Sequence, residues 1–184
     1  MIATAVTLPV VILLALLIGN ITGDANAPKK SGPPGAIVVP APPHAAANAA
    51  TCNKVIGALP VQLGTLAPRV VHPHPDSPYV VAWGDPAVIL SCGVDRPAAL
   101  QPGSSQQLFD AGDLKGPYYV VTTSGSTFTW TSVDRAVYLS IQVPAKYHAT
   151  PVVALSKAIA SVLPAVCSTN PKDDPHTLCA ERTD

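Results

Sequence analysis

The amino-acid sequence predicts an α+β fold: a mostly antiparallel sheet with an N-terminal and a C-terminal helix packed on it, preceded by one transmembrane helix. Residues 52–66 and 152–163 place apolar side chains at three- and four-residue steps, which is the periodicity of a helix buried on one face. The segments between them alternate apolar and polar residues, as strands do. The chain also opens on a long apolar segment without charge, which is typical of a membrane span.

The composition limits the size of the protein and its partners. The 184 residues include 11 basic and 11 acidic side chains, so the formal net charge is zero. Only 12% of the residues are charged, against roughly 25% in an ordinary soluble domain. Such a chain lacks the clustered Lys and Arg that bind a phosphate backbone, and we expect no nucleic-acid partner. The length allows one domain with appendages.

The first 23 residues form the expected membrane segment. They contain no charged side chain, and Val10–Ile18 is an unbroken aliphatic run. About 20 apolar residues in a helix span a bilayer core of roughly 30 Å. We expect residues 1–23 to remain as a single-pass anchor. Signal cleavage followed by secretion is the alternative, since Ala25-Asn26-Ala27 has the small-residue pattern of a cleavage site, although Pro28 disfavours a cut there.

Residues 24–50 are rich in proline and alanine. A segment of this composition buries too little apolar surface to offset its ordering entropy, so we expect an extended spacer between membrane and domain. The folded domain is expected to cover residues 51–167.

The first predicted helix begins near Cys52, with Thr51 as its N-cap, and Pro60 is expected to kink or split it. The run His72–Asp76 alternates histidine with proline and predicts a turn-rich loop. The second helix follows Pro151 and is stopped by Pro164.

Five strands are predicted between the two helices. The last is the clearest, because Val137, Leu139, Ile141 and Val143 alternate with smaller or polar residues. Gly125-Ser126 separates two of the strands and predicts a hairpin turn. The predicted strands are 79–83, 87–94, 118–123, 127–132 and 136–143.

The chain has four cysteines, which allow three pairings into two disulfides. Cys52 lies on the apolar face of the first helix and Cys92 on the inward side of a strand, so a bridge between them is expected. The second disulfide would then join Cys167 to Cys179 and hold the C-terminal tail, residues 168–184. No C-x-x-C pair is present, so we expect no metal. Two disulfides would place the domain outside the cytoplasm. Lys29 and Lys30 after the helix favour the opposite orientation, because positively charged residues are enriched on the cytoplasmic side, but we give the cysteines more weight.

Two segments resemble an actinobacterial family catalogued as domain of unknown function 3515. They read YVVAWGDPAVILSCGV from Tyr79, followed by Arg96-Pro97, and TSVDRAVYLSIQVP from Thr131. The resemblance covers about Cys52 to Pro164 and implies a secreted or membrane-anchored protein. The shared residues correspond here to Cys52, Trp83 with Gly84 and Pro86, Cys92 with Gly93, and Arg135 with Tyr138. The family implies no activity and no cofactor.

Catalytic motifs are absent from the sequence. Glu181 is the only glutamate, and neither G-x-S-x-G nor S-x-x-K occurs. The candidate interaction residues are Trp83, Asp85, Arg96 and Arg135. Trp83 is expected as a core aromatic or, alternatively, as an exposed platform for a partner or glycan. Arg135 is expected in an ion pair with Asp85 or Asp95 or, alternatively, as an anion-binding group.

Two functions follow as hypotheses. The favoured one is a non-enzymatic, membrane-tethered module of the cell envelope that binds or scaffolds another envelope protein or a cell-wall polymer. The alternative is an extracytoplasmic enzyme that acts on an envelope component through an Asp/His site. A fold that brings no Asp and His within hydrogen-bond reach would argue against the enzyme.

Overall fold

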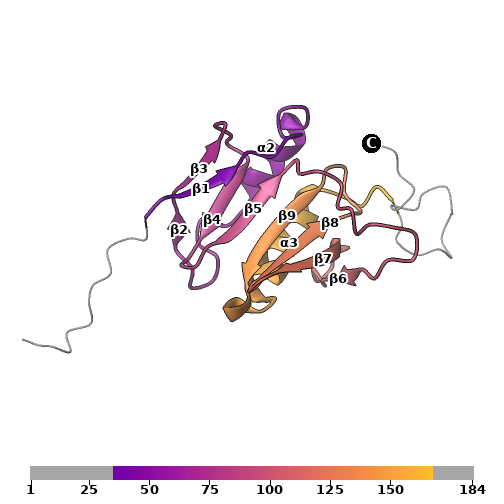
Figure 1. Ribbon diagram of the computed structural model, residues 1–184. Helices are drawn as coiled ribbons and strands as arrows, with labels where there is room; N and C mark the ends of the chain where they lie inside the picture. The colour runs from indigo at the N-terminus through magenta and orange to yellow at the C-terminus, as the bar shows by residue number, and fades with distance from the viewer. Residues whose placement is uncertain (1–34, 168–184) are drawn as a thin grey trace, which may run out of the picture. The chain divides into compact units, whose positions relative to one another are not determined.

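A computed structural model describes residues 35–167 of the chain (Figure 1). The α+β class is confirmed, with two helices and a mostly antiparallel sheet. In chain order the elements are β1 (Ile37–Pro40), α2 (Ala49–Ala58), β2 (Pro68–Arg69), β3 (Val71–His74), β4 (Val80–Trp83), β5 (Val88–Cys92), β6 (Gln107–Leu108), β7 (Tyr118–Ser124), β8 (Thr127–Ser132), β9 (Leu139–Pro144), a short 3-10 helix η1 (Ala145–Tyr147) and α3 (Thr150–Val162).

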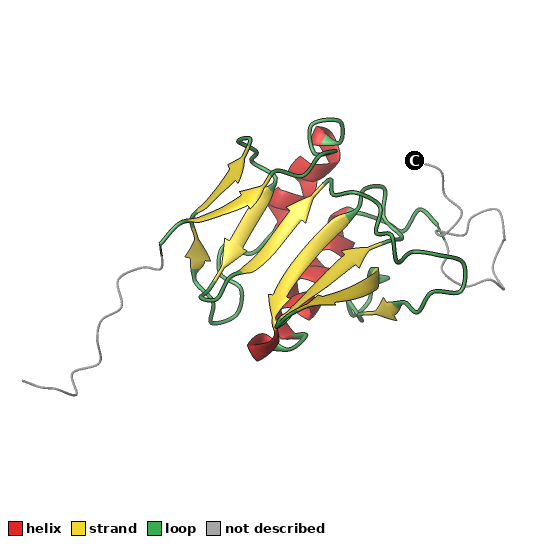
Figure 2. Ribbon diagram, in the orientation of Figure 1, coloured by secondary structure: helices red, strands yellow, loops and turns green. Residues whose placement is uncertain are grey.

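The main sheet has seven strands in the order β2-β4-β5-β9-β8-β7-β6. Every neighbouring pair in it is antiparallel. Both helices lie on one face of this sheet, behind the strands in Figure 2. We call this the helix face and the opposite side the open face.

The core lies between the sheet and the two helices. The expected alternation in β9 is confirmed, because Leu139, Ile141 and Val143 are fully buried whereas Gln142 is exposed. In α2 and α3 the buried residues follow the helical spacing that predicted both elements. The core contains Cys52, Val55, Trp83, Val88, Leu90, Cys92, Tyr119, Leu139, Ile141, Val143, Val152, Leu155 and Ile159.

A second, smaller apolar cluster contains Leu100, Val120, Val133 and Tyr138. Val120 pairs with Thr131, which pairs in turn with Ser140, and paired residues point to the same face of a sheet. Along each strand these residues alternate with the buried residues that point to the helix face, so the smaller cluster lies on the open face. It explains why Tyr138 is buried although the strand pattern predicts an outward side chain.

The first helix differs from the prediction at both ends. It begins at Ala49 after Asn48, so Thr51 lies inside the helix and is not its N-cap. The Asn48 side chain donates to the His44 carbonyl, at 2.9 Å, rather than capping the helix. The helix ends at Ala58, because a helix rarely continues into the residue before a proline, and Pro60 lies beyond the end.

Regular structure also begins earlier than expected. β1 and the first residues of α2 lie within the 24–50 range that we expected to be a spacer. β1 pairs in parallel with β3, from Ile37 opposite Val71 to Pro40 opposite His74. β3 therefore replaces the first part of the loop expected at His72–Asp76. Proline is tolerated here because the pair forms a separate two-stranded sheet, in which every strand is an edge.

Among residues 35–167, no helix is long and apolar enough to span a membrane. The predicted anchor at residues 1–23 and the predicted tail at 168–184 lie outside the described residues.

Candidate functional site

A groove of about 220 Å³ lies on the open face of the sheet. We call it the hydroxyl groove, after the side chains that β5 and β9 place in it. The sheet contributes Ile89, Ser91, Ser140 and Gln142, the segment 39–43 contributes Val39, Pro40, Ala41, Pro42 and Pro43, and the turn after β5 contributes Val94 and Asp95.

The register of the sheet aligns three hydroxyl side chains across adjacent strands. Ser91 of β5 is opposite Ser140 of β9, and Ser140 is opposite Thr131 of β8. Ser91 is 8% exposed, and Ser140 and Thr131 are each 7% exposed. Among the described residues none of the three hydroxyls has a hydrogen-bond partner. None of these three oxygens is among the fully buried side-chain atoms of the described residues that lack a partner, so water still reaches them. Ser91 and Ser140 also line the groove, where a ligand hydroxyl can replace that water.

The segment that borders the groove is fixed to the end of β5. The His44 amide donates to the Gly93 carbonyl at 2.9 Å. Gly93 has a φ of +86°, and a Cβ atom there would lie 2.5 Å from the Ala45 nitrogen. Only glycine permits this conformation and this close approach. Gly93 is thus needed to position the segment 39–45 over the sheet.

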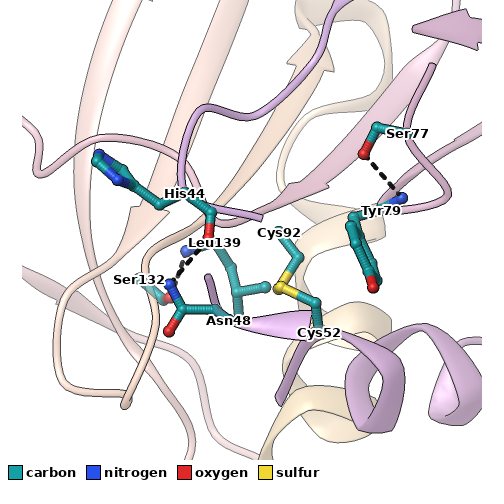
Figure 3. The surroundings of a disulfide bond; sticks show 8 residues. All are labelled: His44, Asn48, Cys52, Ser77, Tyr79, Cys92, Ser132 and Leu139. Carbon is teal, nitrogen blue, oxygen red and sulfur yellow. Dashed lines mark hydrogen bonds between the residues drawn. A yellow bond between two sulfur atoms is a disulfide. The ribbon is translucent and has the colours of Figure 1, made fainter. Parts of the chain in front are cut away.

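The disulfide between Cys52 and Cys92 is confirmed, with a Cα–Cα distance of 5.7 Å. It ties α2 to the end of β5, directly before Gly93, and Figure 3 shows Asn48 and His44 beside it. Cys167 is also disulfide-bonded, whereas Cys179, its expected partner, lies outside the described residues.

One histidine and one aspartate do lie within hydrogen-bond reach at the groove. His44 Nε2 is 2.9 Å from Asp95 Oδ1, and both side chains are exposed. The carboxylate can orient the imidazole, as in hydrolytic sites. However, among residues 35–167 no hydroxyl or thiol is hydrogen-bonded to His44. Asp95 can therefore orient His44 as a base, but no nucleophile among the described residues is hydrogen-bonded to His44.

A second cavity, of about 360 Å³, lies where the loop after α2 meets the N-terminus of α3. Its lining includes Leu63, Leu66, Lys146, Tyr147 and His148. The Lys146 ammonium group donates to the Asp85 carbonyl at 2.6 Å and lies 4.7 Å from the Tyr147 ring centre. This lysine is thus already engaged in holding the turn at Asp85.

Trp83 is a core residue and not an exposed platform. Its side chain is fully buried, and Nε1 donates to the carbonyls of Pro60, at 3.2 Å, and Val61, at 3.1 Å. The indole therefore fixes the loop that follows α2. Gly84 next to it has a φ of +75°, and a Cβ atom there would lie 3.1 Å from the Tyr147 hydroxyl.

The charged candidates are distributed over three separate places. Asp85 accepts from Arg69 at 2.8 Å, and Arg69 also donates to the Gly35 carbonyl. Arg96 donates to the Tyr138 hydroxyl and to the Leu100 carbonyl, and so holds the cluster on the open face. Neither aspartate that we expected for Arg135 is its partner.

Arg135 instead pairs with its neighbour in sequence. Its Nη1 is 3.3 Å from Asp134 Oδ2, and both side chains are almost completely buried. The guanidinium also donates to the Lys115 carbonyl, and Asp134 Oδ1 accepts from the Tyr118 amide at 3.0 Å. These bonds fasten the loop before β7 to the end of β8. Arg135 has no surface with which to bind an external anion, so its function is structural.

Burial raises the pKa of Asp134, while Arg135, the Tyr118 amide and Lys115 oppose that shift. The folded state therefore binds more protons than the unfolded chain at pH values above the usual 3.8. We expect this residue to make the free energy of unfolding fall as pH rises from about 4 towards neutrality. Urea unfolding across that pH range should show a steeper fall of the free energy of unfolding in the native protein than in Asp134→Asn. An Asp113→Asn control, at an exposed site, should retain it; equal slopes in all three proteins would contradict the assignment.

No group of three or more His, Cys, Asp or Glu side chains within residues 35–167 could hold a metal ion. Of the residues singled out from the sequence, Cys52 and Cys92 are joined, whereas Trp83, Asp85, Arg96 and Arg135 do not converge. The groove residues Ser91 and Ser140 have no sequence signal beyond the polar positions of two strands, and His44 lies in a turn beside the groove. Their proximity depends on strand register, which the sequence pattern does not specify.

Comparison with known proteins identifies a family and no individual relative. A family model described as Protein of unknown function (DUF3515) matches residues 6–167. None of the curated proteins matches the chain. No solved structure matches it either.

Proposed function

This chain belongs to the family described as Protein of unknown function (DUF3515), and we propose that it is a binding module and not an enzyme. In this proposal the N-terminal helix tethers an extracytoplasmic domain to the membrane, and the hydroxyl groove takes up a component of the cell envelope. The observation that carries this proposal is the position of Ser91 and Ser140, whose residues line the groove and whose hydroxyls have no partner among the described residues.

Two further features support the proposed location. Residues 1–23 are uncharged and apolar over the length that a bilayer requires. The Cys52–Cys92 disulfide is the kind of bond that persists in oxidising compartments and is rare in the cytoplasm. A domain outside the cytoplasm and attached to the membrane would meet envelope polymers directly.

The proposal is tested by sedimentation with insoluble envelope polymer from which all protein has been removed by protease. The full chain, held in phosphocholine nanodiscs, is expected to sediment with the polymer. The Ser91→Ala/Ser140→Ala double variant should lose most of this binding, because it removes both hydroxyls and little volume. Thr122→Ala is the matched control, since Thr122 is an exposed residue of the same open face outside the groove lining.

Absence of sedimentation, or equal sedimentation of the native chain and the double variant, would refute binding through this groove. Loss of binding in Thr122→Ala to the same extent would also refute it, because the effect would then not be specific to the groove. Thermal unfolding of each variant verifies that the fold is retained.

The enzyme remains a second candidate because His44 and Asp95 meet at 2.9 Å beside the groove. A hydrolase at this place would use His44 as the base and Asp95 to orient it. Prolonged incubation with the same polymer is expected to release no soluble fragments. Release that depends on the native chain and stops in both His44→Gln and Asp95→Asn would establish the enzyme and overturn the binding module.

A further inference from the structure

We propose that the ligand of the hydroxyl groove is an uncharged saccharide, bound by its hydroxyl groups on the sheet and by a ring face on the proline segment. The inference rests on the proposed binding function and deepens it by naming the ligand class. It follows from the polar groups, the apolar surface and the charge of one small cavity.

The polar side of the groove consists of uncharged groups that both donate and accept. Ser91 and Ser140 lie opposite each other on β5 and β9, and Gln142 is the next outward residue along β9. A hydroxyl can donate one hydrogen bond and accept two, and an amide offers both functions. Sugar hydroxyls have the same dual character, so each can form a hydrogen bond with a group that has no partner within residues 35–167.

The segment 39–43 supplies the other kind of surface. All five of its residues are apolar, and the rigid rings of Pro40 and Pro43 belong to exposed residues, whereas Pro42 is buried. A sugar ring has C–H groups on its faces and hydroxyls around its edge. A groove with hydroxyls from the sheet and prolines from the adjoining segment therefore matches both parts of the ring.

The charge of the lining disfavours the other small polar ligands. Among the described residues that line the groove, Asp95 is the one charged residue and none is Lys or Arg. A phosphate or carboxylate would meet a carboxylate without a cation to balance it, which costs binding energy. A divalent cation would require several oxygen ligands with negative charge, and a single carboxylate does not provide them.

The backbone and the volume disfavour a peptide. The groove lies on the face of β5 and β9, whose backbone groups are paired with each other, so a strand cannot be added there. A cavity of about 220 Å³ is also smaller than the roughly 300–1,000 Å³ of typical drug-sized sites. This volume suits a single ring of a longer chain.

The test is calorimetric titration of the full chain in phosphocholine nanodiscs, prepared without glycosidic detergent. The probes are neutral hexasaccharides of glucose, galactose, mannose and arabinose, with hexagalacturonic acid as the charged counterpart. At least one neutral probe is expected to bind, and the acid to bind at least tenfold more weakly. Ser91→Ala and Ser140→Ala should each weaken binding by about tenfold, the effect of one lost hydrogen bond.

Gln142→Ala provides a second groove variant at an exposed position, where folding is not at risk, and Thr122→Ala is the control. Failure of all four neutral probes, tighter binding of the acid, or neutral binding unchanged in the groove variants would overturn the inference. If the polymer sedimentation above succeeds and depends on Ser91 and Ser140 while the neutral probes fail, the binding function stands and the saccharide is wrong. If sedimentation and titration both fail, both proposals are wrong.

Discussion

Replacement of Cys52 and Cys92 together by alanine is expected to lower the free energy of unfolding by about 2–5 kcal/mol. The disulfide closes a loop between residues 40 positions apart, so its loss enlarges the conformational entropy of the unfolded chain. Both sulfur-bearing side chains are fully buried, and truncation also removes core contacts between α2 and β5. Urea unfolding of the native and double-variant chains under oxidising conditions measures the difference.

The control for this prediction is native protein treated with a thiol reductant, which opens the same bond without removing side-chain volume. It should lose part of the same stability, and the variant should be less affected by reductant than the native chain. Equal unfolding midpoints for the native chain and the variant would show that the bond contributes no stability. Alkylation of the unreduced native chain should label neither Cys52 nor Cys92.

Trp83→Ala is expected to lower the free energy of unfolding by about 3–5 kcal/mol, the usual effect of removing a large buried aromatic ring. The indole fills the space between the sheet and the loop after α2, and its N–H binds two carbonyls of that loop. Trp83→Phe keeps most of the volume and loses the hydrogen bonds, so we expect about 1–2 kcal/mol. Chemical denaturation of the variants measures this series.

Val61→Ala is the matched control, because Val61 supplies one of the two carbonyls while its side chain is 82% exposed. This variant should change stability by less than about 0.5 kcal/mol. A small effect of Trp83→Ala, similar to that of Val61→Ala, would contradict the core position. Because the indole is buried, a Trp83 variant reports on stability and not on ligand binding.

The elements that the sequence predicted well are those with a strong local pattern. The sequence of β9 alternates apolar and polar residues from Leu139 to Val143, and α3 combines helical spacing with a proline at its first turn. The Cys52–Cys92 bond was also predictable, since both residues lie on apolar faces that must meet in the core. β1 and β3 were missed because four-residue strands rich in proline have no distinct period.

The site was less predictable than the fold. The sequence indicated Trp83 and Arg135 as candidate interaction residues, yet both are buried and hold loops in place. The serines of the hydroxyl groove are ordinary outward residues of two strands that are far apart in the chain. No local rule pairs Ser91 with Ser140, since their register is set by the packing of the whole sheet.

The sequence by itself determined the fold class, the main strands, the two helices and the first disulfide, because periodic burial of apolar side chains is encoded locally. Only the tertiary structure decided which polar groups from distant parts of the chain come together: His44 beside Asp95 at the surface, and Ser91 beside Ser140 in the groove. The physical reason is the range of the interactions. Periodicity requires only neighbouring residues, whereas a site requires the register between strands and the path of a segment held by Gly93, which depend on contacts distant in sequence.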